Sequence, residues 1–170
     1  MSEAKEYELP GVKVYDLKVL PDERGSFTEA FRRDWQEFVG EDEIVQVNIS
    51  VSYPGIIRAW HRHLRGQVDY FLVLQGALKI CAYDDREDSA TRGKLIEIIA
   101  SHHKPQLVRM PGIYWHGSKN VSNEPSLLMY FVTRLYDYQN PDEERRPWND
   151  PKVIDPRTGE PFDWNRLPHK

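Results

Sequence analysis

Short apolar stretches recur about every ten residues along this chain, and Gly, Pro, Asn or Asp stand between them. The clearest is Ile44–Ser52, where Val45, Val47, Ile49 and Val51 alternate with polar residues. A period of two is that of a β-strand, whose successive side chains point to opposite faces. Many short strands separated by turn residues are typical of a β-sandwich or jelly-roll barrel. We therefore expect an all-β fold.

Only one segment has helical spacing. Glu29–Phe38 carries apolar residues four and then three positions apart, which predicts a short helix near the N-terminus. The long β-rich run Val68–Tyr83 is expected to break into a hairpin at Gln75-Gly76. The other strands are expected at Val12–Leu20, from Ile56 to Trp60, and at Lys94–Ile99, Gln106–Met110 and Leu127–Thr133.

The length of the chain, 170 residues, suits one domain spanning residues 1–170. The strands fall within residues 10–138, which we take as the core of a jelly-roll barrel. Residues 139–170 are rich in Pro and charge and poor in aliphatic side chains. We expect this segment to be an irregular C-terminal tail, fixed on the domain by Trp148 and Trp164.

Composition limits the partners and the setting. The net charge of −4 argues against a nucleic-acid-binding domain, which usually carries a basic excess. The single cysteine, Cys81, cannot form an internal disulfide, so a reducing compartment is expected. No stretch approaches the roughly 18 apolar residues of a membrane span, and the N-terminus lacks a signal-peptide pattern. These features predict a cytoplasmic protein with no membrane partner.

The polar face of the Ile44–Ser52 strand is the first candidate ligand site. Gln46, Asn48, Ser50 and Ser52 project from one side of it. Amide and hydroxyl groups suit a barrel interior that hydrogen-bonds a polar ligand. Polar-out alternation is also common on exposed sheets, so the sequence leaves both interpretations open.

Three histidines form the second candidate site. His61 and His63 are two residues apart, so they share one face of a strand, and His116 follows a tight turn at Pro111-Gly112. Such histidines could ligate a metal, or one could act as a general base beside a hydrogen-bonded neighbour. Histidines that only pack or hydrogen-bond are the third alternative.

The histidine spacing is similar to that of the cupin superfamily, which implies a jelly-roll barrel. The matching residues are Gly55, His61, His63, Asp69, Gly76, Pro111, His116 and Asn120.

A narrower resemblance covers most of the chain. A series of ordered motifs resembles those of dTDP-4-dehydrorhamnose 3,5-epimerases. These motifs are Asp22–Glu29, Gln46–Ser50, Gly55–His61, Asp84–Ser89, Pro111–Gly117, Tyr130–Tyr136 and Trp148–Asp150.

This resemblance implies an isomerase that acts on a nucleotide-linked 4-keto-6-deoxy sugar and needs no cofactor. A base removes a proton from the carbon next to the ketone, and an acid returns a proton to the other face of the enolate. By resemblance, His61 is the base and Tyr130 the acid. His116 and Asp84 resemble a supporting polar pair near the enolate.

The resemblance also implies how the substrate is held. Some of the contacts come from a second subunit, so a homodimer is expected. The residues that resemble substrate contacts are Arg24, Phe27, Glu29, Gln46, Asn48, Arg58, His63, His116 and Trp148.

Two residues depart from the family pattern and keep alternatives open. Asp69 stands where the family has a lysine, and His63 stands where it has a glutamine. A metal-dependent cupin enzyme with ligands His61, His63, Asp69 and His116 is therefore one alternative. A nucleotide-sugar 3,4-ketoisomerase and a non-catalytic sugar-binding cupin are the others. The family's C-terminal S-x-K-D segment, whose aspartate orients the catalytic histidine, has no match in this chain.

Overall fold

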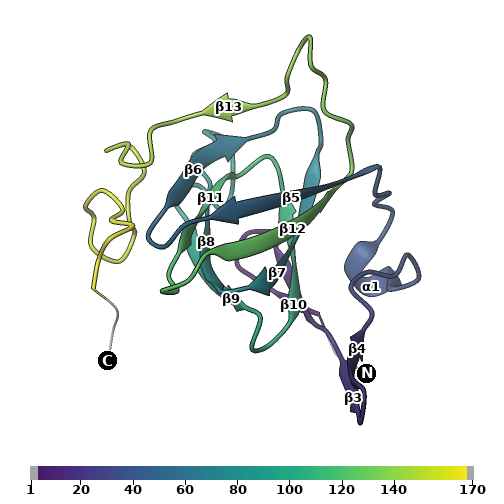
Figure 1. Ribbon diagram of the computed structural model, residues 1–170. Helices are drawn as coiled ribbons and strands as arrows, with labels where there is room; N and C mark the ends of the chain where they lie inside the picture. Colours follow the sequence, from purple (N-terminus) through teal and green to yellow (C-terminus); the bar gives the residue numbers. More distant parts are fainter. Residues whose placement is uncertain (1–3, 168–170) are drawn as a thin grey trace.

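Two antiparallel β-sheets face each other in the computed structural model, which describes residues 4–167 (Figure 1). The predicted all-β fold is confirmed. The six-stranded sheet contains, in spatial order, β1 (Lys5–Glu6), β2 (Lys13–Asp16), β10 (Gln106–Pro111), β7 (Val68–Gln75), β12 (Ser126–Val132) and β5 (Gln46–Ser52). The five-stranded sheet contains β13 (Glu144–Arg145), β6 (Ile57–Arg62), β11 (Trp115–Asn120), β8 (Ala77–Tyr83) and β9 (Leu95–Ser101).

The apolar core lies between the two sheets. Its members alternate along the strands with outward-facing residues, as the strand period requires. They include Leu9, Val12, Val14, Phe71, Val73, Leu78, Ile80, Ile96, Ile98, Val108 and Met110. Phe71 and Ile80 also line the cavity described below. The core therefore supplies the floor of that cavity.

The N-terminal segment differs from the prediction. The helix α1 spans only Gln36–Val39, where residues 29–38 were expected. Phe31 instead packs against Tyr70 and Phe131, with ring centroids 5.7 and 5.9 Å apart, so tertiary contacts fix the irregular segment before the helix. No helix within residues 4–167 is long and apolar enough to cross a membrane.

A two-stranded hairpin, β3 (Val19–Asp22) and β4 (Gly25–Thr28), projects away from the two sheets (Figure 1). The expected strand Val12–Leu20 is therefore two strands, β2 and β3. The hairpin exposes Phe27, whose side chain is 64% accessible.

The C-terminal tail is fixed by one of the two predicted tryptophans. Trp164 is fully buried, and its ring centroid lies 4.9 Å from that of Trp60 on β6. The ammonium groups of Lys79 and Lys119 both donate to its backbone carbonyl at 3.2 Å. Trp148 is exposed, so its predicted anchoring role is wrong. The tail also contributes β13, which pairs with β6 beside His61.

Candidate active site

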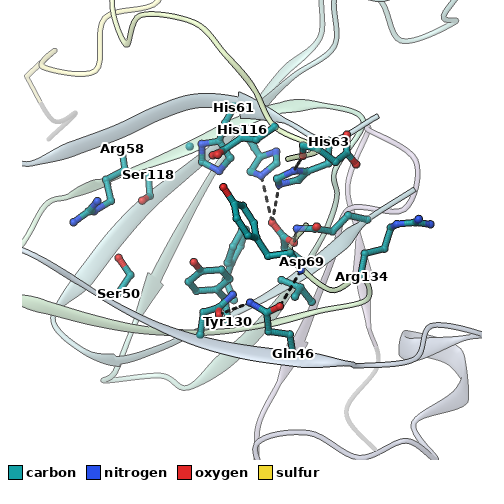
Figure 2. Close-up of a pocket in the computed structure, with 18 of the residues that line it drawn as sticks. Gln46, Ser50, Arg58, His61, His63, Asp69, His116, Ser118, Tyr130 and Arg134 are labelled. Carbon is teal, nitrogen blue, oxygen red and sulfur yellow. Dashed lines mark hydrogen bonds and ion pairs between the residues drawn. The ribbon is translucent and has the colours of Figure 1, made fainter. Parts of the chain in front are cut away.

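A cavity of about 970 Å³ opens between the two sheets, and polar side chains line most of it (Figure 2). β6 and β11 of the five-stranded sheet supply His61 and His116. β5 supplies Gln46, Asn48 and Ser50 from the opposite sheet. The polar face of β5 thus points into the cavity. This orientation is the one expected for a barrel interior, not for an exposed sheet face.

The three predicted histidines meet on one wall of this cavity. His116 is paired with His61 across the β6–β11 ladder, and their ring centroids lie 4.4 Å apart. His63 follows β6 and lies on the same side. Each imidazole presents one nitrogen such that the three nitrogens lie within 4.8 Å of one another. Strand alternation explains this meeting, since His61 and His63 share the inward face of one strand.

Asp69 on β7 reaches the same group of histidines from the facing sheet. Its Oδ2 atom lies 3.6 Å from Nε2 of His63 and 3.5 Å from Nε2 of His116. Its Oδ1 atom accepts a hydrogen bond of 2.7 Å from the amide of Gln67. Burial raises the pKa of Asp69, but the bonds to His116 and His63 lower it by more, so the net pKa falls below its ordinary value. Asp69 is therefore a carboxylate at neutral pH.

The environment of His61 keeps its imidazole neutral. Burial lowers its pKa well below the ordinary value, and the neighbouring His116 and His63 lower it further. A neutral imidazole has a free nitrogen lone pair, which a general base requires. His61 therefore meets the electrostatic requirement for the predicted base.

Tyr130 lies on the wall opposite His61. It comes from β12 of the six-stranded sheet, where it pairs with Asn48 of β5 (Figure 2). Burial raises the pKa of its hydroxyl, and the charge of Asp69 raises it further. Tyr130 consequently keeps its proton at neutral pH. The structure thus places a neutral imidazole and a protonated phenol on facing walls of one cavity.

Arg58 lines the cavity because β6 is irregular. Its position in the alternation puts it on the outer face with Trp60. However, the register between β6 and β11 shifts between His116 and Ser118, and such a bulge can redirect a side chain. The guanidinium donates to Ser52 Oγ at 2.9 Å and to the Val51 carbonyl at 3.0 Å.

Asp84 does not form the predicted pair with His116. Among residues 4–167, its carboxylate accepts hydrogen bonds from Arg86, Ser89 and Thr91. These bonds close the turn after β8, and Asp84 does not line the cavity. The carboxylate next to His116 is Asp69 instead. The sequence motif around Asp84 therefore marks a buried turn, and the predicted pairing of Asp84 with His116 is wrong.

Four other predicted contacts lie away from the cavity of their own chain. Arg24 forms an ion pair with Asp22 at the hairpin tip, and Glu29 forms one with Arg32. Phe27 is exposed on β4 and Trp148 on the tail. None of Arg24, Phe27, Glu29 and Trp148 lines the cavity within this chain.

Several cavity residues were missed from the sequence. The loop between β6 and β7 brings Arg65 to the cavity, and the loop after β12 brings Arg134. The tail adds Asp142, and Arg145 of the short strand β13. These segments are loops or too short for an alternation pattern, so no periodicity marked them.

Comparison with known proteins identifies the family of this chain. A family model described as dTDP-4-dehydrorhamnose 3,5-epimerase matches residues 6–155. A probable low-salt glycan biosynthesis epimerase of Haloferax volcanii is 48% identical over 81% of this chain and 87% of its own length. The spore coat polysaccharide biosynthesis protein SpsL of Bacillus subtilis is 34% identical over 92% of this chain and 97% of its own length.

A solved structure of a related epimerase has a similar fold. The dTDP-6-deoxy-D-glucose-3,5-epimerase of Legionella pneumophila, in complex with dTDP-4-keto-L-rhamnose, superposes with a TM-score of 0.80. It is 26% identical, and the match covers 90% of this chain and 81% of that one. The predicted cupin barrel is thereby confirmed. The chain belongs to the dTDP-4-dehydrorhamnose 3,5-epimerase family.

Proposed function

We propose that this protein epimerises a nucleotide-linked 4-keto-6-deoxy sugar by proton transfer next to the ketone. The observation that carries the proposal is the placement of His61 and Tyr130 on facing walls of one cavity. Inversion of a carbon needs a proton removed from one face and another delivered to the opposite face. A sugar ring held between the two walls meets both groups.

The two groups have the protonation states that the reaction needs. Neutral His61 takes the proton from the carbon next to the C4 ketone, and the electron pair moves onto the ketone oxygen to form an enolate. Tyr130 then donates its proton to the opposite face of that carbon while the ketone re-forms. Solvent then takes the proton from His61 and returns one to Tyr130, and repetition at the second carbon next to the ketone gives a double epimerisation.

The polar strand β5 suits the nucleotide end of such a substrate. Gln46 and Asn48 present amide groups to the cavity, and Gln46 Nε2 donates to Asn48 Oδ1 at 2.9 Å. The guanidinium of Arg58 can donate two hydrogen bonds to a phosphate. The Legionella relative, in its complex with dTDP-4-keto-L-rhamnose, supports a nucleotide sugar as the substrate class. The names of two relatives support a place in glycan or surface polysaccharide biosynthesis.

A homodimer would complete the site. The outer face of β5 exposes Val47, Ile49 and Val51, an apolar stripe on an edge strand. Exposed apolar stripes of this kind mark interaction surfaces. The projecting β3–β4 hairpin carries the predicted contacts Arg24 and Phe27, with Glu29 directly after it. We infer that the hairpin of one subunit reaches the cavity of its partner.

The test is solvent deuterium incorporation into a panel of 4-keto-6-deoxy sugars linked to thymidine, uridine, cytidine or guanosine diphosphate. Proton NMR in D₂O should show loss of the C3 or C5 proton signal and appearance of the inverted sugar for one nucleotide. His61→Asn should slow this exchange by at least about 100-fold, the usual contribution of a general base. A ketone that moves from C4 to C3 would identify a ketoisomerase and refute the epimerase proposal, as would no exchange with any substrate.

A further inference from the structure

The enolate of the proposed reaction needs positive charge beside its oxygen, and the lysine of the family pattern suits this task. Asp69 stands at that position in this chain, and its carboxylate faces imidazoles. Within residues 4–167 the cavity lining contains no lysine, so its permanently charged cations are arginines. These are Arg58, Arg65, Arg134, Arg145 and Arg146. A replacement for the lysine must come from this set.

Strand β13 places Arg145 beside His61. In the pairing of β13 with β6, Arg145 lies opposite His61 and Glu144 lies opposite Arg62. Residues directly opposite in an antiparallel pair point to the same face, with Cβ atoms about 4.5–5.5 Å apart. Because His61 faces the cavity, Arg145 faces it too and contributes to its lining. Glu144 follows the alternation and accepts a hydrogen bond of 2.6 Å from Arg62 Nε on the other face.

Contacts of the neighbouring Arg146 hold β13 in place. The Arg146 amide donates to the Trp60 carbonyl at 2.9 Å, and the Trp60 amide donates to the Arg146 carbonyl at 3.0 Å. The Arg146 guanidinium lies over the Trp115 ring at 4.2 Å and forms an ion pair with Asp85. These contacts fix the backbone of Arg145 without using its own side chain.

The guanidinium of Arg145 remains available to a substrate. Its one side-chain hydrogen bond within residues 4–167 goes to the Glu143 carboxylate at 2.8 Å. A guanidinium has further N–H donors and keeps its charge at every physiological pH. The Arg145 side chain is 76% exposed at the cavity mouth, so a nucleotide sugar that fills the cavity would meet it directly.

The other arginines of the lining are directed elsewhere. Figure 2 shows the side chains of Arg58 and Arg134 on opposite sides of the cavity, with both guanidinium groups pointing away from His61. Arg65 donates to a backbone carbonyl of the tail at 2.9 Å. Arg146 is held in its stack on an indole ring. Arg145 is therefore the arginine best placed beside the base.

We propose that Arg145 stabilises the enolate that forms when His61 removes the substrate proton, in place of the family's lysine. As the electron pair moves onto the ketone oxygen, the guanidinium donates a hydrogen bond to that oxygen and keeps its own proton. Its positive charge offsets the developing negative charge, which the Asp69 carboxylate would otherwise repel. This role rests on the proposed epimerase function.

Arg145→Gln tests the role, because it removes the charge and keeps a polar side chain. Deuterium exchange into the substrate, measured by proton NMR at saturating concentration, should show kcat lowered by at least about tenfold and KM nearly unchanged. Arg145→Lys keeps a cation and should be clearly faster than Arg145→Gln. Arg92→Gln makes the same charge change at an exposed turn and should exchange at the wild-type rate.

Nucleotide binding separates this role from a contact to the diphosphate. Calorimetry uses the free nucleoside diphosphate with the base of the substrate that the deuterium panel identifies. Arg145→Gln should bind it as tightly as the wild type, because that ligand carries no ketone. Weaker binding with an unchanged kcat would assign Arg145 to the diphosphate and overturn the proposal. Circular dichroism should confirm that each variant is folded.

The outcome also separates this inference from the epimerase proposal. Wild-type exchange with an equal kcat in Arg145→Gln would overturn the role of Arg145 and leave the epimerase standing. Equal losses in Arg145→Lys and Arg145→Gln would show that the charge is not what matters, and would overturn it as well. No exchange by the wild type on any sugar of the panel would overturn both, since no enolate would form.

Discussion

Asp69 and Asp84 are both buried carboxylates, and their partners decide what each can do. Asp84 is neutralised by the guanidinium of Arg86 and by hydroxyl groups in its own turn. Asp69 has no guanidinium or ammonium partner among the described residues; its ion-pair neighbours are imidazoles. The Asp84 carboxylate therefore stabilises the fold, whereas the Asp69 carboxylate faces the imidazoles of the cavity.

The first prediction concerns Asp84→Asn. This change should lower the free energy of unfolding at pH 7 by about 1–3 kcal/mol, because it weakens a network of buried hydrogen bonds. Deuterium exchange per folded molecule should stay at the wild-type rate. Urea denaturation and proton NMR measure the two effects. A folded variant that loses exchange would restore the catalytic role that the motif first suggested.

The same residue gives a pH prediction. Burial raises the pKa of Asp84, but its bonds to Arg86, Ser89 and Thr91 lower it by more, so the folded-state pKa lies below the ordinary value. The stabilisation is therefore complete above the unfolded-state pKa of about 3.9 and is lost as the pH falls through the folded-state pKa. Denaturation at a series of pH values should show the stability gap between wild type and Asp84→Asn shrinking below about pH 4. A gap that widens there would contradict this account.

At the scale of elements, the connection from β6 to β7 positions His63. Gly112 lies against it: the His63 amide donates to the Gly112 carbonyl at 2.7 Å, and the Gly112 amide donates to the Gln67 carbonyl at 2.8 Å. A Cβ atom at position 112 would stand 2.6 Å from that carbonyl oxygen and 2.8 Å from Cβ of His63. The glycine is thus required by close backbone approach.

Gly112→Ala should accordingly destabilise the protein by about 1–3 kcal/mol, the usual cost of overpacking. It should also shift the NMR signals of His63, because the two backbones must separate. Asn123→Ala, at an exposed turn, is the control and should change stability by less than about 0.5 kcal/mol. An unchanged melting temperature in Gly112→Ala would show that this contact is not tight.

The sequence predicted the strands better than the irregular segments. Alternation along β5 identified which side chains point inward, because the side-chain period of a strand is fixed. The same rule brought His61 and His63 to one wall. The alternation rule placed Arg58 on the wrong face, because the bulge in the β6–β11 pairing cannot be predicted from residue periodicity. The helix was overestimated because Phe31 packs against Tyr70 and Phe131, a tertiary contact that helical spacing does not record. The cavity residues Arg65 and Arg134 lie in loops and carried no pattern.

In the whole molecule, the proposed site requires residues from two subunits. The cavity holds His61 and Tyr130, while Arg24 lies on a hairpin that points away from it. A partner's hairpin would then supply the missing contacts. Burial of the β5 stripe against the second subunit would also explain why Val47, Ile49 and Val51 are exposed on one edge strand.

Mixing two inactive variants tests this arrangement. Arg24→Ala and His61→Asn should each be nearly inactive alone. Co-refolded in equal amounts they should recover about a quarter of wild-type activity, since half the dimers are mixed and each mixed dimer has one complete site. Light scattering should confirm a dimer of the chain. Recovery of no activity by a mixed dimer would show that each subunit completes its own site.

In the proposed reaction, the two walls of one cavity exchange protons with opposite faces of a keto sugar. The most direct test of this reaction compares wild type, His61→Asn and Tyr130→Phe in D₂O, with NMR reading both deuterium content and configuration next to the ketone. Wild type should incorporate deuterium and invert, Tyr130→Phe should incorporate deuterium without inversion, and His61→Asn should do neither. Inversion by Tyr130→Phe, or exchange by His61→Asn at the wild-type rate, would contradict the account.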